Sequence, residues 1–175
     1  MERIAVKNWD RLDFVELLRK SKCKLGVEVG TYNGEFASML ERAMPELKLT
    51  CVDPYKEQGD NYLDIANNSQ EVQDLRYLMV RKLLRGKVLR QYSKDACQCF
   101  EDGSLDLVYI DANHEYESVY EDILLWRPKV KKGGILSGHD YSWTHHGVRN
   151  AVKELVAVDH NVCVFGRDDI WCSML

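Results

Sequence analysis

The amino-acid sequence predicts an α/β fold in which an open, largely parallel sheet is covered by helices on both faces. Five short apolar runs alternate with stretches of helical periodicity, a pattern typical of parallel sheets. Two further runs, Asn161 to Phe165 and Ile170 to Met174, are separated by the short segment Gly166 to Asp169 and predict an antiparallel hairpin. No repeat, low-complexity stretch or linker divides the 175 residues. We therefore expect one domain, residues 1–175, built on a seven-stranded sheet with an antiparallel terminal strand.

Composition excludes several classes of protein. The net charge of −4 weakens the case for a nucleic-acid partner, because phosphate binding needs a basic face. No apolar run reaches membrane-spanning length, and the N-terminus lacks the apolar core of a signal peptide. The six cysteines form no CxxC pair and no zinc spacing. We expect a cytoplasmic protein with no membrane partner and with reduced thiols.

The first part of the chain is organised around a glycine turn. Asp10 to Lys20 predicts an amphipathic helix within a helical extension of residues 1–24. Leu25 to Val29 is a short apolar strand, and Gly30 to Gly34 interrupts it before a helix from Glu35 to Arg42. Such a turn lets the backbone and the N–H groups of the helix approach a ligand. The alternative is a strand, turn and helix that bind nothing.

Glu28 indicates which ligand this turn accepts. It stands two residues before Gly30, and the spacing of Gly30 and Gly34 is not the GxGxxG pattern. A carboxylate beside the turn argues against the pyrophosphate of NAD. It suits a ligand with a positive end, such as an ammonium or a sulfonium group.

The rest of the chain continues the alternation. Ser69 is expected to cap a helix to Leu84 whose Val72, Leu75 and Met79 share a face, and Tyr55 to Asn68 is expected to be a loop or a lid. The remaining expected strands are 47–52, 87–92, 105–110 and 135–137, and the remaining expected helices are 94–100, 117–126 and a helix marked by Val148, Val152 and Leu155.

Polar residues follow the strands repeatedly. Because ligands bind beyond the carboxyl ends of parallel strands, these residues are candidates for a site. Asp53 ends the second strand, where a carboxylate can accept both hydroxyl groups of a ribose, although an Asp-Pro turn is an equal alternative. Ser93 and Lys94 end the third strand, where an adenine edge would lie.

The most specific group of candidate site residues follows the fourth and fifth expected strands. Asp111 ends one strand, His114 comes three residues later, and His139 with Asp140 ends the next strand. Carboxylates from adjacent strands can hold one Mg²⁺, and His114 can accept a proton near neutral pH. The alternative makes His114 a helix cap and His139-Asp140 an ordinary turn. His145 and His146 are interpreted as loop residues near the mouth of the site.

Three segments resemble a known family. VEVGTYNGEFA, residues 27–37, is similar to the first motif of the metal-dependent small-molecule O-methyltransferases, the catechol type included. YIDANHEYESVYEDILLW and KKGGILSGHDY, residues 109–126 and 131–141, are similar to a set of small bacterial methyltransferases. The chain thus resembles a class I S-adenosylmethionine-dependent methyltransferase, with macrolide-sugar O-methyltransferases as relatives.

The resemblance implies a Rossmann-like sheet whose last strand inserts antiparallel. It also implies the site residues: Glu28, Gly30, Tyr32 and Gly34 around the methionine part of the cofactor, Asp53 on the ribose, Ser93 near the adenine, Asp111 at both the cofactor and the metal, Asp140 and His139 at the metal, and His114 with Asp111 in catalysis.

We therefore expect methyl transfer from S-adenosylmethionine to a hydroxyl group of a small polyhydroxy or sugar-like molecule, assisted by Mg²⁺. Two other readings remain open. One is a metal enzyme of the same fold with changed chemistry, such as a hydroxylase-like relative. The other is an inactive cofactor-binding module.

Overall fold

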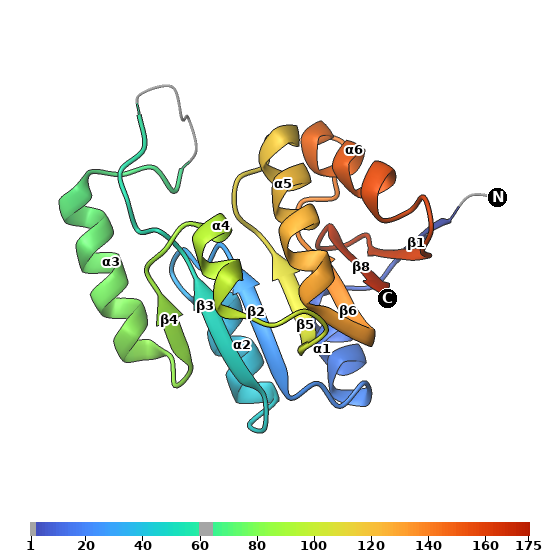
Figure 1. Ribbon diagram of the computed structural model, residues 1–175, viewed down its shortest axis with the longest axis horizontal. Coiled ribbons are helices and arrows are strands. Elements are labelled where there is room, and N and C mark those ends of the chain that lie inside the picture. Colours follow the sequence, from blue (N-terminus) through green and yellow to red (C-terminus); the bar gives the residue numbers. More distant parts are fainter. Residues whose placement is uncertain (1–2, 60–64) are drawn as a thin grey trace.

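The strands form one mixed sheet in the order β1-β7-β8-β6-β5-β2-β3-β4 (Figure 1). The computed structural model describes residues 3–59 and 65–175. Within that part of the chain only β8 runs antiparallel to its neighbours, β6 and β7. The predicted fold class and the antiparallel insertion of the last strand are confirmed. The strands are β1 (Ile4–Lys7), β2 (Leu25–Val29), β3 (Lys48–Val52), β4 (Lys87–Leu89), β5 (Leu105–Ile110), β6 (Val130–Gly138), β7 (Val162–Phe165) and β8 (Ile170–Met174).

Helices cover both faces of the sheet, as predicted. Trp126 and Val152, from α5 and α6, are buried in a cluster on one face, and Phe14 and Leu40, from α1 and α2, are buried in a second cluster on the other. No described helix combines the length and the hydropathy that a membrane span requires. The helices are α1 (Arg11–Lys20), α2 (Glu35–Ala43), α3 (Gln70–Leu83), α4 (Ser93–Ala96), α5 (Tyr116–Trp126) and α6 (His146–Leu155), with 3₁₀ turns η1 (Cys97–Cys99) and η2 (Arg127–Lys129).

The sheet has eight strands rather than the expected seven, because the N-terminal segment contains a strand as well as a helix. β1 pairs parallel with β7, from Ile4 opposite Val162 to Lys7 opposite Phe165. Side chains of this edge strand are mostly exposed, so it carries no buried apolar pattern. Its pairing depends on backbone hydrogen bonds, which any sequence can make.

The shared apolar face predicted for the helix after Ser69 points to solvent. Val72, Leu75 and Met79 of α3 are all exposed. The buried residues of α3 are Gln73 and Val80. α3 lies at the edge of the molecule beside β4 (Figure 1), and its buried side packs on that short strand and on the turn at Gly34.

The carboxyl ends of four strands meet at one edge of the sheet. Val29 at the end of β2 lies opposite Val52 of β3 and Ile110 of β5, and Ile110 lies opposite Gly138 of β6. The polar residues that follow these strands are therefore brought together, as predicted. The loop expected at Tyr55 to Asn68 also reaches this edge, but its residues 60–64 lie outside the described part of the chain.

Candidate active site

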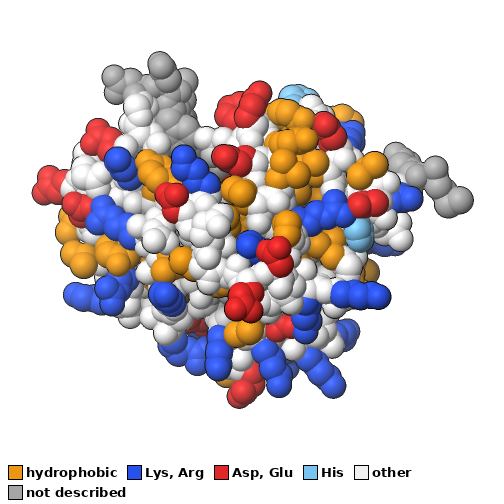
Figure 2. Space-filling model, in the orientation of Figure 1, with side chains coloured by type: hydrophobic (Ala, Val, Ile, Leu, Met, Phe, Trp, Pro, Cys, Tyr) orange, Lys and Arg blue, Asp and Glu red, His pale blue; other side chains and the backbone are white. Residues whose placement is uncertain are grey.

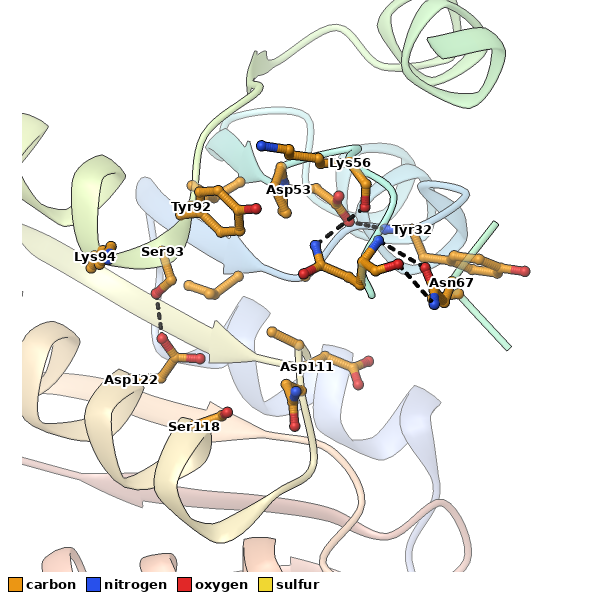
Figure 3. A pocket seen from close by; sticks show the side chains of 18 of the residues that line it. Tyr32, Asp53, Lys56, Asn67, Tyr92, Ser93, Lys94, Asp111, Ser118 and Asp122 are labelled. Carbon is orange, nitrogen blue, oxygen red and sulfur yellow. Dashed lines mark hydrogen bonds between the residues drawn. The ribbon is translucent and has the colours of Figure 1, made fainter. Parts of the chain in front are cut away.

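A cavity of about 640 Å³ opens at the carboxyl ends of β2, β3 and β5 (Figure 3). This volume lies within the usual range of small-molecule sites. Its walls include five residues that the sequence assigned to a cofactor: Gly30, Tyr32, Asp53, Ser93 and Asp111.

Gly30 lets the end of β2 pass against the end of β5. Its φ is +87°, and a Cβ atom there would lie 2.0 Å from the carbonyl oxygen of Asp111. Its N–H donates to the carbonyl of Val52 at 2.8 Å, while the N–H of Asp111 donates to the carbonyl of Val29 at 2.7 Å. Only glycine fits this left-handed position without displacing the backbone.

Gly34 is positioned differently from the expectation. It precedes α2 with φ +74°, and a Cβ atom there would lie 3.2 Å from Cγ1 of Val80 in α3. Gly34 is not among the described residues that line either cavity. The tight approach between the start of α2 and α3 accounts for this glycine.

Asp53 ties the glycine turn to the end of β3. One carboxylate oxygen accepts from the N–H groups of Thr31 and Tyr32, at 3.1 and 2.9 Å, and the other accepts from the N–H of Tyr55 at 2.8 Å. Burial raises the pKa of Asp53, while these backbone donors partly offset the rise. Asp53 therefore orders the turn and also borders the cavity.

Ser93 lies at the other end of the cavity, in a buried network that sequence reasoning missed. Its hydroxyl donates to the carboxylate of Asp122 and accepts from Nε1 of Trp126 at 2.8 Å (Figure 3). Burial raises the pKa of Asp122 to about 6. Asp122 projects from α5 to the cavity wall. It was not predicted from the sequence, because an acidic residue in the middle of a helix is usually a surface residue.

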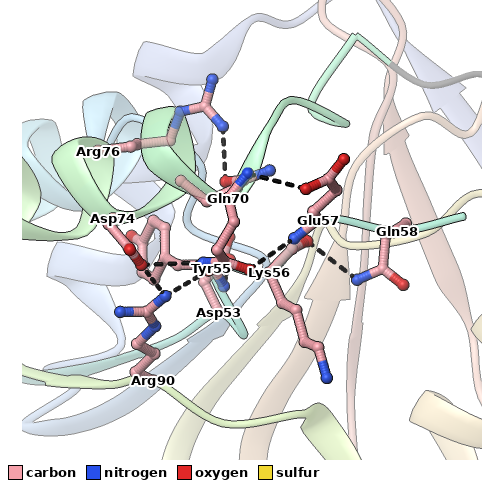
Figure 4. Close-up of polar contacts among 10 residues, drawn as sticks. Asp53, Tyr55, Lys56, Glu57, Gln58, Gln70, Asp74, Arg76 and Arg90 are labelled. Carbon is pink, nitrogen blue, oxygen red and sulfur yellow. Dashed lines mark hydrogen bonds and ion pairs between the residues drawn. The ribbon is translucent and has the colours of Figure 1, made fainter.

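The chain that follows β3 is fastened to α3 by polar contacts (Figure 4). The side-chain amide of Gln70 and the guanidinium of Arg90 both donate to the carbonyl of Tyr55, at 3.1 and 2.8 Å. The N–H of Gln70 donates to the Glu57 carboxylate at 3.0 Å, and the N–H of Glu57 donates to the Gln70 side chain at 3.2 Å. These contacts hold one wall of the cavity in place.

A second cavity of about 270 Å³ adjoins the first. Gly30, Tyr32 and Asp111 line both, so the two cavities meet at the ends of β2 and β5. Glu28 lines the smaller one, although it was expected around the cofactor with the glycine turn. Arg11 of α1 also lines it, and no local motif of the sequence pointed to Arg11.

Glu28 is an acid that burial keeps protonated. Its exposed fraction is 2%, and burial, followed by the nearby charge of Asp111, raises its pKa to about 8. Within the described part of the chain, Oε2 of Glu28 has no hydrogen-bond partner. A buried polar atom of this kind is expected to meet a water molecule or a ligand group.

Acids and histidines gather on the other side of the smaller cavity. His114 Nε2 lies 2.9 Å from an Asp140 oxygen and 3.9 Å from Asp111, and His139 Nδ1 lies 3.1 Å from Asp140 and 3.7 Å from Asp111. His145 Nδ1 is 3.4 Å from the other Asp140 oxygen. The structure thus brings together all the predicted metal and catalytic residues, and it adds His145.

The charges of this cluster are strongly coupled. Hydrogen bonds to Asp111 and Asp140 raise the pKa of His114 to about 10. Burial raises the pKa of Asp140, but His114 and His139 outweigh it and hold that pKa well below its usual range. In this arrangement His114 is protonated at neutral pH, in contrast to the neutral base that the sequence suggested.

The donor set fits a divalent cation. One donor atom each from Asp111, His139 and Asp140 lie within 4.8 Å of one another, and the same holds for His114, Asp140 and His145. Carboxylate oxygens suit Mg²⁺, whereas imidazole nitrogens suit transition metals. Asp140 belongs to both sets, so it is the central candidate ligand.

Comparison with known proteins gives the context of these cavities. A family model described as a methyltransferase domain matches residues 27–141. Among curated proteins, the uncharacterized protein y4gI of Sinorhizobium fredii is 27% identical over 124 residues, which are 69% of this chain and 13% of that protein. This chain therefore spans about an eighth of the length of that relative.

Several solved structures share the fold. The O-methyltransferase NovP is 20% identical with a TM-score of 0.67, over 91% of this chain and 75% of that one. SAH-bound methyltransferase PaMTH1 of Podospora anserina is 14% identical with a TM-score of 0.64, over 94% and 78%. An O-methyltransferase of Bacillus cereus, in complex with SAH, is 16% identical with a TM-score of 0.59, over 93% and 79%.

Proposed function

This chain belongs to the methyltransferase-domain family, and from that membership we propose that it transfers the methyl group of S-adenosylmethionine to a hydroxyl group of a small polyhydroxy molecule. The observation that carries this proposal is the shared wall between the two cavities, at Gly30 and Asp111. A methyl donor in the larger cavity and an acceptor in the smaller one would meet beside the cluster of acids and histidines.

The larger cavity offers matching contacts for the methyl donor. Asp53 borders the glycine turn, where a carboxylate suits a ribose. Ser93 and Asp122 border the far end, where they suit the polar edge of an adenine. The Bacillus cereus and Podospora anserina methyltransferases, which share this fold, were solved with SAH bound, which supports a ligand of this kind.

The smaller cavity suits an acceptor with two adjacent oxygen atoms. In the proposed reaction a carbon–oxygen bond forms, the carbon–sulfur bond of the sulfonium breaks, and the hydroxyl proton must leave. A divalent cation held by Asp111, Asp140 and His139 would supply Lewis acidity that lowers the pKa of that hydroxyl. His114 lies 2.9 Å from Asp140 and in its neutral form is the candidate proton acceptor. A cation on Asp111 and Asp140 would offset the carboxylate charges that raise the pKa of His114.

The proposal is tested by measuring binding and turnover. We expect SAH to bind in calorimetry, and S-adenosylmethionine to be converted to SAH with at least one member of a panel of catechols, polyols and sugars in the presence of Mg²⁺. NAD binding in place of SAH, with the protein folded, would contradict the proposal. SAH binding without turnover on any acceptor would favour a binding module.

Replacing Asp53 with alanine is expected to weaken SAH binding about 10- to 100-fold. The variant loses the carboxylate proposed to bind the ribose, which also orders the glycine turn, and the loss of one hydrogen bond to a charged group costs about 1.5–3 kcal/mol. Calorimetry with SAH measures the change. Asp95→Ala, at an exposed acid of α4, is the control and should bind like the wild type; equal affinity in both variants would remove Asp53 from the cofactor site.

Replacing His114 with alanine is expected to slow turnover about 100-fold, the usual contribution of a general base. SAH affinity should stay unchanged, because His114 lines the smaller cavity and not the larger one. The control is His160→Ala, because His160 also pairs with an acid, Asp159, at 2.7 Å, but outside both cavities. A fully active His114→Ala variant would make this histidine structural.

A further inference from the structure

The outward face of α3 carries an unusual number of exposed apolar side chains. Met79 is 71% exposed, Leu75 56% and Leu83 52%, and Val72 and Leu78 are exposed as well. Figure 2 shows apolar side chains at the edge of the molecule where Figure 1 places α3. Single exposed apolar residues are normal, but a contiguous group on one helix marks an interaction surface.

These side chains form one stripe along the helix. Val72, Leu75, Met79 and Leu83 follow one another at intervals of three and four residues, which places them on the same side of an α-helix. Gln73 and Val80, the buried residues of α3, lie to one side of the stripe, and Leu83, at the end of the stripe, also reaches the turn at Gly34. The spacing of the stripe matches the seam of a helix pair.

We propose that α3 packs antiparallel against α3 of a second copy of this chain, about a two-fold axis that crosses the stripe between Leu75 and Met79. An antiparallel pair centred there sets Leu75 opposite Met79 of the second copy, and Val72 opposite Leu83 of the second copy. The midpoints of both pairs fall at or next to residue 77. One axis close to the level of residue 77 thus sets the stripe against its own copy, as an isologous interface requires.

The charges beside the stripe have the same symmetry. Glu71 and Lys82 are exposed, and they stand eleven residues apart, close to three full turns, so they flank the stripe on one side. The midpoint of this pair falls between residues 76 and 77, close to the midpoints of the apolar pairs. The antiparallel arrangement sets Glu71 near Lys82 of the second copy twice.

This self-complementarity is what selects a second copy over an unrelated partner. An unrelated protein would place no symmetry requirement on α3, and neither the apolar spacing nor the charges would need a common midpoint. The proposal is independent of the proposed function. Of the α3 residues that border the larger cavity, Gln73 is buried, and Arg76 lies at the margin of the stripe, beside Val72 and Met79.

The first test is sedimentation equilibrium of the full chain. We expect a reversible dimer, and Met79→Glu is expected to raise the dimer dissociation constant about 30-fold or more, as for loss of a central interface residue. Leu124→Glu is the matched control, because Leu124 is 50% exposed on α5, and it should dimerise like the wild type. A monomer at every concentration would overturn the proposal, and so would a dimer that Met79→Glu leaves intact.

The second test uses charge reversal, which perturbs no apolar packing. Glu71→Lys and Lys82→Glu are each expected to weaken the dimer about 2- to 10-fold, and the double variant is expected to regain wild-type affinity, because each exchange restores an opposite-charge pair. Circular dichroism confirms that each variant is folded. Additive weakening in the double variant would overturn the antiparallel pairing.

Discussion

Replacing Asp111 with asparagine is expected to reduce metal-dependent turnover by about 1000-fold or more, while SAH binds within a few-fold of the wild type. Asp111 lines both cavities and its side chain lies within 4 Å of His114 and His139. The amide keeps the shape of the carboxylate but loses its charge, so the cluster loses a hard cation ligand. Electrostatic and Lewis-acid assistance of this kind contributes several kcal/mol to a transition state.

Three measurements separate the causes of this loss. Steady-state turnover is compared with and without EDTA, SAH affinity is measured by calorimetry, and metal content is measured on the purified variants. Asp159→Asn is the control, because Asp159 pairs with Arg127 and His160 on the surface. If EDTA has no effect on the wild type and Asp111→Asn stays active, the cluster is structural and the metal-assisted mechanism is wrong.

Among substitutions of glycine by alanine, Gly30→Ala is expected to reduce the stability of the protein the most. The added Cβ would lie 2.0 Å from the carbonyl oxygen of Asp111, and φ at this position is +87°. The collision is with backbone, so no side-chain rotation relieves it. We expect a loss of stability of about 3 kcal/mol or more and a loss of measurable SAH binding, because β2 and β5 must separate at the wall that both cavities share.

The variant Gly103→Ala is a control that separates the steric clash of a new Cβ atom from the strain of a left-handed backbone conformation. Gly103 also has a positive φ, +66°, but a Cβ atom there would meet nothing within 4 Å. Its variant should lose only about 1 kcal/mol, the cost of the left-handed conformation. Urea denaturation and SAH calorimetry compare the two. Equal stability of both variants would mean that the ends of β2 and β5 can move apart freely.

The elements of the sheet could be predicted because their signals are local. Each buried strand carries its own apolar run, and the strand–turn–helix at Gly30 is written in consecutive residues. Parallel strands present their carboxyl ends at one edge of the sheet. This rule predicted that Asp53, Ser93, Asp111 and Asp140 lie close together. The antiparallel hairpin at the C-terminus was readable from its short connection for the same reason.

What the sequence missed depends on contacts between distant segments. Arg11 reaches the smaller cavity because α1 packs beside strands that come more than a hundred residues later, and its guanidinium lies 3.3 Å from His139. Asp122 borders the larger cavity because α5 crosses behind Ser93. His145 was expected near the mouth of the site, but only the conformation of the loop between β6 and α6 brings it within 3.4 Å of Asp140. None of these distances is encoded in neighbouring residues.

The sequence by itself determined the α/β class, the family, the glycine turn and the strand ends at which chemistry is expected, because periodicity and turn residues act over a few positions. Only the tertiary structure decided that Glu28 faces the smaller cavity, that Ile4–Lys7 adds an eighth strand, and that the apolar stripe of α3 faces outward. An apolar pattern shows that a helix has two faces; which face is covered depends on what packs beside it, and at the edge of the sheet the described chain leaves the stripe uncovered.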